Sequence, residues 1–292
     1  MDKVTVIMRT KNSGEFMPAV LKALFSQEGV DFELAVIDSS STDKTVECLK
    51  LYPHHFTQIP AEEYVPGPVL NRMVEKAETP IVVFLNSDAH LLSPNSLSEL
   101  LRPFDDPDVE ATFGRQRPRP DALAWVEHAL EVSFPAHGPA PDWVPFALPF
   151  AAMRKSAWER HPFYSKAWGS EDTEWGVWAN RIEYVPRATV MHSQNYTQKQ
   201  LYGRMFIEGE ADAFIYGKYA SGPAQALLCL KEMVREVWLG VKKGEWRGLL
   251  QVPARCLIRR LAYWRGNQLG HKRIKTGCKN LRVGQQAVLS RY

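Results

Sequence analysis

The chain has 292 residues, of which 45% are hydrophobic and 24% are charged. This length and composition are ordinary for a folded chain with a substantial core, and they argue against intrinsic disorder. The formal net charge of +3 conceals an asymmetry, because residues 240–292 contain 13 Lys or Arg and one acid, whereas the remainder carries more acids than bases.

Four cysteines are spread through the chain at Cys48, Cys229, Cys256 and Cys278, without a CxxC pair. We therefore expect neither a disulfide framework nor a structural zinc site. The first residues resemble neither a signal peptide nor a transit peptide, and no stretch approaches the roughly 20 apolar residues of a membrane span. These features predict a cytoplasmic protein.

Three strand–helix units are predicted in the first third of the chain. Apolar and β-branched runs at 3–8, 32–37 and 80–85 are typical of buried strands. Helices are predicted at 16–25, 43–51 and 70–77, between these runs. Gly67 is expected to shape a turn. This order predicts an α/β fold with a mainly parallel, Rossmann-like sheet and helices on both of its faces.

Polar residues stand at the predicted carboxyl ends of these strands, at Arg9, Asp38 and Asp88. In open parallel sheets, ligands bind beyond the carboxyl ends of the strands. We therefore expect these three residues to lie near one ligand site, an inference that rests on the pattern alone.

The second half of the chain is less regular. Residues 104–149 are rich in Pro and Trp and give no clear assignment, whereas 171–180 indicate a helix and 183–185 and 190–192 indicate two short strands. Beyond residue 198 the pattern is helical, with apolar stripes over 227–241 and 257–264. We expect a catalytic domain over 1–222 and a basic helical extension over 223–292.

Several segments in this order resemble family 2 glycosyltransferases. They are VTVIMRTKNSG (4–14), AVIDSSSTDKT (35–45), IVVFLNSDAH (81–90), WGSEDTEW (168–175) and VMHSQNYT (190–197). FGRQRPRPDA (113–122) adds a likeness to bacterial rhamnosyltransferase-like members. The resemblance implies a GT-A fold and inverting transfer of a sugar from a nucleoside-diphosphate donor to a hydroxyl group, in the synthesis of a bacterial surface polysaccharide.

The resemblance places a metal-binding carboxylate at Asp88. The usual Asp-x-Asp motif reads Asn86-Ser87-Asp88 here, so a second ligand is needed, and His192 is the residue that the family suggests. Oxygen and imidazole ligands suit Mn²⁺ or Mg²⁺, and the imidazole favours Mn²⁺. The alternatives are a turn-capping role for Asp88, a structural role for His192, and His90 as a substitute ligand.

The paired acids of the family correspond to Glu171 and Asp172. An inverting transfer needs a base that takes the proton from the attacking hydroxyl, and we assign that role to Asp172. Glu171 is expected to orient the acceptor or support the base. Trp168, Trp175 and Trp178 lie beside these acids, and indole faces bind sugars, although most tryptophans belong to the core. Acids also occur at helix N-termini for electrostatic reasons.

The remaining family positions are expected to bind the nucleotide. This set contains Arg9, Thr10, Asn12, Asp38, Ser39, Asp43, Asn71, Ser87 and Asp88. Ser39 occupies the slot where many members carry the acid that reads a pyrimidine, so UDP and dTDP both remain open. Arg72 is a further candidate for a base or phosphate contact.

The basic extension has three interpretations. It could bind an anionic membrane surface beside a lipid-linked acceptor, it could be a solvated face of a packed helical subdomain, or it could bind nucleic acid. Nothing that resembles a nucleic-acid-binding motif accompanies it, so we expect no nucleic-acid partner. Two rival functions also remain. One is a sugar nucleotidyltransferase, although such enzymes usually begin with a Gly-rich loop that residues 8–14 lack. The other is a catalytically inactive binding module.

Overall fold

The computed structural model describes residues 3–277, whose contacts divide them into two compact units. Within the described residues, unit 1 comprises 3–121, 129–163 and 172–193, and unit 2 comprises 122–128, 164–171 and 194–277. Unit 1 contains the whole sheet, and unit 2 contains the C-terminal helices. The expected functional boundary at residue 222 remains a prediction.

Unit 1 is built on a mixed sheet of eight strands in the order β3-β2-β1-β4-β7-β6-β8-β5. Four pairings are parallel (β1 with β2 and β4, β2 with β3, β6 with β8) and three are antiparallel (β4 and β6 with β7, β5 with β8). The sheet is therefore less strongly parallel than the sequence suggested. The strands are β1 (Val4–Thr10), β2 (Phe32–Asp38), β3 (His55–Gln58), β4 (Ile81–Leu85), β5 (His90–Leu91), β6 (Ala111–Arg117), β7 (Phe150–Arg154) and β8 (Ile182–Met191).

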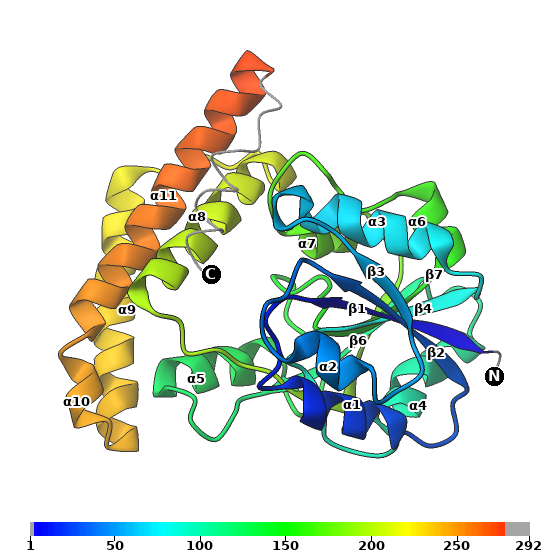
Figure 1. Ribbon diagram of the computed structural model, residues 1–292. Helices are drawn as coiled ribbons and strands as arrows, with labels where there is room; N and C mark the ends of the chain where they lie inside the picture. The colour runs from blue at the N-terminus through cyan, green and yellow to red at the C-terminus, as the bar shows by residue number, and fades with distance from the viewer. Residues whose placement is uncertain (1–2, 278–292) are drawn as a thin grey trace. The chain divides into compact units, whose positions relative to one another are not determined.

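Helices cover both faces of this sheet, as predicted (Figure 1). Alternate side chains of a strand point to opposite faces, so Val6 and Met8 of β1 join one hydrophobic cluster and Ile7 joins the other. The first cluster is completed by α1 (Met17–Phe25), α2 (Thr45–Leu49) and α4 (Ser96–Leu101), and the second by α3 (Pro66–Lys76), α6 (Lys155–Arg160) and α7 (Glu171–Trp178).

Three further short elements complete the chain before the C-terminal helices. They are the 3₁₀ turns η1 (Ala61–Glu63) and η2 (Arg102–Asp105) and the helix α5 (Ala124–Ser133). Gly67 lies in the first turn of α3, one residue after Pro66, so the expected turn at this position is wrong. The fixed φ of proline suits the first helical position, where its missing N–H has no intrahelical partner to lose.

A bulge changes the register between β6 and β8 part-way along the two strands. The register moves from Gly114 opposite Val185 to Arg115 opposite Thr189, so the two short strands expected near 183–192 form one strand. A Cβ on Gly114 would lie 2.5 Å from the carbonyl oxygen of Ala188, so only glycine allows this approach of the two backbones.

The helices of unit 2 follow the helical pattern predicted beyond residue 198. They are α8 (Gln198–Ile215), α9 (Gly222–Lys243), α10 (Trp246–Leu249) and α11 (Val252–Thr276). Thr197 and Gln200 form a capping box at the start of α8, Ser221 caps α9, and Gly244 ends α9 with a positive φ of 76°.

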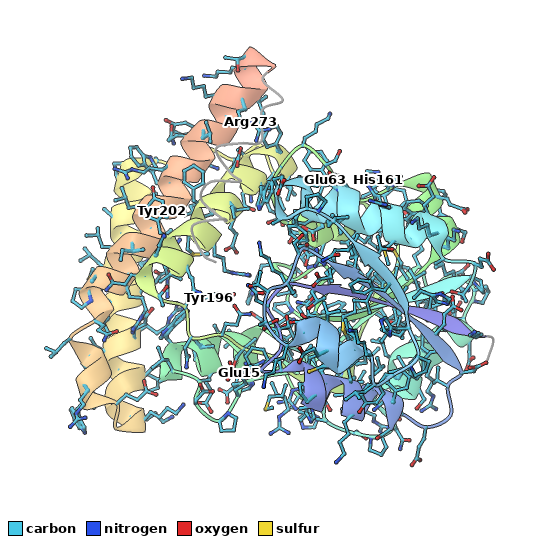
Figure 2. The ribbon with its side chains drawn as sticks, viewed as in Figure 1. Glu15, Glu63, His161, Tyr196, Tyr202 and Arg273 are labelled. Atoms are coloured by element: carbon cyan, nitrogen blue, oxygen red, sulfur yellow. The ribbon has the colours of Figure 1, made fainter. Side chains whose placement is uncertain are left out.

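Helix α11 packs closely against α8 because glycines line their contact (Figure 1). A Cβ on Gly266 would lie 1.9 Å from the carbonyl oxygen of Phe206, and one on Gly209 would lie 2.1 Å from that of Tyr263. No larger residue fits at either position without separating the helices. Arg273 of α11, labelled in Figure 2, adds a buried ion pair with Glu210 of α8.

Many bases of the C-terminal segment form ion pairs inside unit 2. Lys243, Arg255, Arg259, Arg260 and Arg273 each contact at least one acid. The charge available to a partner is therefore smaller than the sequence count suggested. Cys278 and the bases at 279, 282 and 291 lie outside the described residues, as does the rest of 278–292. None of the described helices is long and apolar enough to cross a membrane.

Candidate active site

One edge of the sheet collects the carboxyl ends of six strands, β1, β2, β3, β4, β6 and β8. β1, β2 and β4 run parallel, β7 runs opposite to them, and β6 and β8 return to the original direction. Thr10 lies opposite Asp38 at this edge, and the Asn86-Ser87-Asp88 turn follows β4. The structure thus places Arg9, Asp38 and Asp88 at or just beyond strand ends on this edge, and their service to one ligand site stays a prediction.

The carboxylate of Asp38 is fully buried and shapes the turn that follows β2. It accepts hydrogen bonds from the backbone N–H of Ser41, at 2.9 Å, and from the Ser41 hydroxyl. Ser39 is also buried, and its N–H donates to the carbonyl oxygen of Thr10 at 3.0 Å. Asp38 therefore shapes the turn after β2, and Ser39 joins that turn to the end of β1, while their contact with a nucleoside remains a prediction.

Asn12 and Asp43 connect the loop after β1 with the loop after β2. Asn12 has a positive φ of 47°, and its Oδ1 accepts the N–H of Thr42 at 2.9 Å. The carboxylate of Asp43 accepts the N–H of Gly14 at 2.8 Å. Burial raises the pKa of Asp43, but hydrogen bonds from Thr45 and Gly14 outweigh it and hold the pKa below its usual value. Asp43 therefore stiffens this part of the edge through its hydrogen bonds to both loops.

Ser87 fastens the turn after β4 to the first loop. Its hydroxyl lies 2.8 Å from the hydroxyl of Ser13, whose N–H donates to Thr45 Oγ1 at 2.7 Å. The hydroxyl of Thr10 is buried and has no hydrogen-bond partner within residues 3–277. Buried hydroxyls usually have a partner, so this atom is a polar group that the fold alone does not satisfy.

Asn71 lies on α3 and forms hydrogen bonds with α6 and with the segment that follows it. Its Oδ1 accepts the indole N–H of Trp158 and the backbone N–H of Phe163, each at 2.8 Å, and its Nδ2 donates to the carbonyl oxygen of Phe163 at 2.9 Å. These bonds give Asn71 a structural role, and its predicted nucleoside contact is untested. Arg9 is half-buried and Arg72 is exposed.

The two proposed metal ligands lie side by side at this edge. His192 Nε2 is 3.4 Å from Asp88 Oδ1, and both side chains are mostly buried. Gln116 of β6 forms a hydrogen bond with the other ring nitrogen of His192, since its Oε1 lies 2.8 Å from Nδ1. Since an amide oxygen can only accept a hydrogen bond, this contact assigns a proton to Nδ1, and Nε2 is the ring nitrogen that faces Asp88.

The strand register explains this arrangement. Gln116 lies opposite Val190 in the parallel pair, and the N–H of His192 donates to the carbonyl oxygen of Arg117 at 3.0 Å. Because side chains alternate along a strand, His192 projects from the same face as Val190 and reaches Gln116. Arg119 supports the other ligand, since its guanidinium donates to the carbonyl oxygen of Asp88 at 2.7 Å.

This donor set fits a divalent cation. Two ligands at right angles, each about 2.1 Å from a metal, lie about 3.0 Å apart, close to the observed spacing of the two atoms. No cluster of three or more His, Cys, Asp or Glu ligands occurs in the described part of the chain. Two protein ligands suffice where substrate phosphates and water complete the coordination. His90, the substitute ligand, has a buried Nδ1 without a partner among the described side chains.

The predicted base, Asp172, is tied to the same strand end. Its Oδ2 accepts the N–H of Leu148 at 3.4 Å, and its Oδ1 accepts the N–H of Thr173 at 2.8 Å. The next residue, Pro149, accepts the N–H of Asn86 at 3.0 Å, in the turn that contains Asp88. A short backbone path therefore joins the carboxylate of Asp172 to the turn that carries the proposed metal ligand.

Glu171 and the three tryptophans have different environments from Asp172. Glu171 begins α7 and is buried. Trp175 is also fully buried, and its indole N–H donates to the carbonyl oxygen of His161 at 2.9 Å. Trp168 is buried as well, and Trp178 stacks on the ring of His161, labelled in Figure 2. Of the two roles weighed for these tryptophans, burial favours a core role for Trp168 and Trp175.

Sequence reasoning missed two residues of the site, Gln116 and Arg119. Both lie in FGRQRPRPDA, a segment that by itself indicates only the family resemblance. A polar glutamine near the end of a predicted strand was the available signal, but its contact with His192 depends on a pairing between segments about 75 residues apart.

Comparison with known proteins gives one family and several structural relatives. Residues 5–168 match the sequence profile of the family described as glycosyl transferase family 2. An O-antigen chain rhamnosyltransferase of Salmonella anatum is 31% identical over 230 residues, which cover 72% of each chain.

Two solved structures share the fold. A mannosyltransferase from Pyrobaculum calidifontis in complex with GDP-Man and Mn²⁺ has a TM-score of 0.59 at 17% identity, covering 99% of this chain and 80% of that one. Residues 1–349 of TarS from Staphylococcus aureus, in complex with UDP, give a TM-score of 0.53 at 15% identity, covering 95% and 92%. These likenesses confirm the expected GT-A fold with its helical extension.

Proposed function

Because this chain belongs to glycosyl transferase family 2, we propose that it transfers a sugar, with inversion, from a UDP- or dTDP-sugar to a hydroxyl of a glycan or lipid-linked glycan. The observation that carries the proposal is the pairing of Asp88 with His192 beside a turn that is linked to Asp172. The relatives support it, since one is an O-antigen rhamnosyltransferase and others were solved with GDP-Man or UDP. We place the reaction in bacterial surface polysaccharide synthesis.

In the proposed reaction, the carboxylate of Asp172 accepts the proton of the acceptor hydroxyl while that oxygen attacks the anomeric carbon. The bond from the anomeric carbon to the diphosphate breaks on the opposite face, and the nucleoside diphosphate leaves with the electron pair. Attack and departure on opposite faces invert the configuration. Glu171, the buried neighbour in the chain, is proposed to orient the acceptor or support the base.

Asp88 and His192 are proposed to hold Mn²⁺ or Mg²⁺ with the donor. The cation, when bound, would neutralise charge on the leaving diphosphate. Gln116 fixes the ring of His192 with Nε2 free to act as a ligand, which is the usual arrangement for a metal-binding histidine. Thr10 and Ser87 offer hydroxyls at the same edge. Arg9, Asn12, Asp38, Ser39, Asp43 and Asn71 complete the proposed nucleotide site, several of them by shaping its loops.

Calorimetry tests the cation-dependent part of the proposal. UDP and dTDP are titrated into wild type and Asp88→Asn, with Mn²⁺ and with a chelator. We expect tight binding only in wild type with Mn²⁺. Asp31→Asn is the matched control, because Asp31 is exposed beside the start of β2 at the opposite edge of the sheet. Equal affinity in all four wild-type and Asp88→Asn conditions would remove Asp88 from the cation site.

Donor hydrolysis separates an enzyme from a binding module. A catalytically inactive module binds the nucleotide but releases no free nucleoside diphosphate, whereas a transferase slowly hydrolyses its donor when no acceptor is present. The absence of release with every UDP- and dTDP-sugar tested would favour the inactive module. A requirement for nucleoside triphosphate would instead favour the nucleotidyltransferase.

The acceptor and location complete the proposal. We propose that the chain works in the cytoplasm, at the inner face of the membrane, where a lipid-linked glycan would be presented. Exposed bases of the C-terminal segment, such as Lys272 and Lys275, support an attraction to anionic lipid. The ion pairs of Arg255, Arg259 and Arg260 limit how much of that segment contributes.

A further inference from the structure

Helix α9 carries an apolar face that unit 2 does not bury. Leu230, Val234 and Trp238 are 61%, 73% and 58% exposed, although they are large hydrophobic residues. Leu227, Val237 and Val241 are also exposed. At 100° per residue, these six positions fall within one stripe about 100° wide. We name this stripe the α9 face.

The opposite side of the same helix is the packed side. Cys229, Glu232, Glu236 and Gly240 are buried there. The α9 face is therefore not a loosely packed part of the core but the outward side of a helix that is already anchored. An exposed apolar stripe of this size usually marks a binding surface.

The charges around the α9 face have one sign. Both acids of the helix, Glu232 and Glu236, are buried and paired with Arg255, Arg259 or Arg260 of α11. The bases Lys231, Arg235 and Lys242 are exposed, and helical geometry places them along one border of the face. The packing thus removes the negative charge from the surface and leaves apolar and positive groups.

We propose that the α9 face lies in the interface of an anionic lipid bilayer, with its apolar side chains among the acyl chains and its bases at the headgroups. A helix that combines an apolar face with flanking bases suits this position. An antiparallel symmetric contact with a second copy is less suitable, because it would bring the base-lined borders of the two faces together. The aromatic ring of Trp238, with Lys242 Nζ 5.2 Å from its centre, suits the boundary between apolar and polar layers.

This inference rests on the proposed location at the membrane and adds the surface that makes the contact. It differs from attraction through the basic segment alone, because the α9 face contributes by burial of apolar area. Removing the segment after residue 222 cannot distinguish the two, since it also exposes the face of α8 that packs against α11.

Vesicle flotation tests the proposal with the full chain. The vesicles contain phosphatidylcholine alone or with about a third phosphatidylglycerol. The variant Leu230→Ser/Val234→Ser/Trp238→Ser is compared with Leu51→Ser/Val132→Ser/Trp143→Ser, which changes the same residue types at exposed positions of unit 1. All six side chains are exposed, so neither variant is expected to unfold the chain.

We expect the α9 variant to bind the anionic vesicles at least tenfold more weakly, while the unit 1 variant binds like wild type. Lys231→Gln/Arg235→Gln/Lys242→Gln should reduce the preference for anionic over neutral vesicles, with the exposed bases of α11 accounting for what remains. Unchanged binding of the α9 variant would overturn the proposal and leave attraction through the basic segment alone. Light scattering without vesicles gives the mass of each protein in solution. If wild type has twice the mass of the α9 variant, the face binds a second copy and the membrane proposal is overturned.

Donor hydrolysis without lipid is measured on the same variants. Because the α9 face takes no part in the proposed chemistry, hydrolysis should be unchanged in each of them. Loss of vesicle binding with normal hydrolysis supports the α9 face independently of the reaction. If the chain binds vesicles normally but hydrolyses no donor, the proposed function is contradicted and the proposed membrane contact of the α9 face is retained.

Discussion

The replacement of Asp172 by Asn tests the proposed chemistry most directly. Asparagine keeps the size of the side chain and removes its ability to accept a proton. Positioned general-base catalysis contributes about 10²- to 10⁴-fold to rate. We therefore expect transfer by Asp172→Asn to fall by that factor, which corresponds to about 3–5 kcal/mol in activation free energy.

The structure limits how much of such a loss could come from unfolding. Asp172 Oδ1 accepts the N–H of Thr173 at 2.8 Å, and the asparagine carbonyl can keep that bond. The amide nitrogen then faces the N–H of Leu148, so one long hydrogen bond of 3.4 Å is lost. This costs at most about 3 kcal/mol of folding free energy, because the lost partner is a carboxylate and the N–H of Leu148 is left without an acceptor. A domain of ordinary stability, about 5–15 kcal/mol, stays almost fully folded after such a loss.

The assay measures transfer rate and donor affinity for Asp172→Asn, Glu171→Gln and Glu174→Gln. Donor affinity should change little in the first variant, because the base is proposed to face the acceptor. Glu174→Gln is the matched control, since this acid lies on the same helix and pairs with His161 at 3.0 Å. We expect it to alter stability more than turnover. Glu171→Gln should be mild, or act through the acceptor KM.

Two results would refute this reasoning. If Asp172→Asn keeps more than about a tenth of the wild-type turnover, the side chain is not the general base, by the magnitude argument itself. If Glu171→Gln is the inactive variant and Asp172→Asn is active, the two acids have exchanged the roles that the family resemblance assigned to them.

Three further predictions concern other parts of the molecule. Gln116→Leu should weaken Mn²⁺-dependent UDP or dTDP binding about 10- to 100-fold in calorimetry, because His192 loses its orienting partner; unchanged affinity would contradict this. Gly266→Ala should destabilise the chain by about 1–3 kcal/mol in thermal melts, whereas Gly222→Ala, whose Cβ meets nothing within 4 Å, should not; equal melting temperatures would count against the close helix contact. Burial raises the pKa of Asp212 to about 6, so its stabilising contribution is complete below about pH 4 and is lost as the pH rises through 6. Asp212→Asn should therefore be more stable than wild type at pH 7, on the order of 2 kcal/mol after allowance for solvent screening, and no more stable at pH 4; a difference that is the same at both pH values would reject the titration.

Local pattern predicted the first half of unit 1 well. The strands β1, β2 and β4 are buried apolar runs of the expected length, and each is followed by polar residues that the fold places at one edge. These features are local, because a run of β-branched residues forms a strand wherever it is buried. Pro66-Gly67-Pro68 misled the same reasoning, since proline at a first helical position has the composition of a turn.

The site was predicted as residue types and not as contacts. Asp88, His192 and Asp172 follow from motifs, but nothing local says that Gln116 holds the ring of His192 or that Leu148 contacts Asp172. Those contacts depend on β6 pairing with β8 and on β7 running antiparallel beside β4. Such pairings join segments that are distant in the sequence, and a one-residue slip would turn the side chains to the other face.

The sequence by itself determined which residues could carry chemistry and that the C-terminal segment is helical, basic and amphipathic. Tertiary structure decided which charges remain available to a partner. Arg255, Arg259 and Arg260 form ion pairs with the two acids of α9. The exposed side of that helix is therefore apolar and bordered by bases. A net charge counts every ionised group equally, whereas a partner meets only the groups that packing leaves on the surface, and packing is a property of the folded chain.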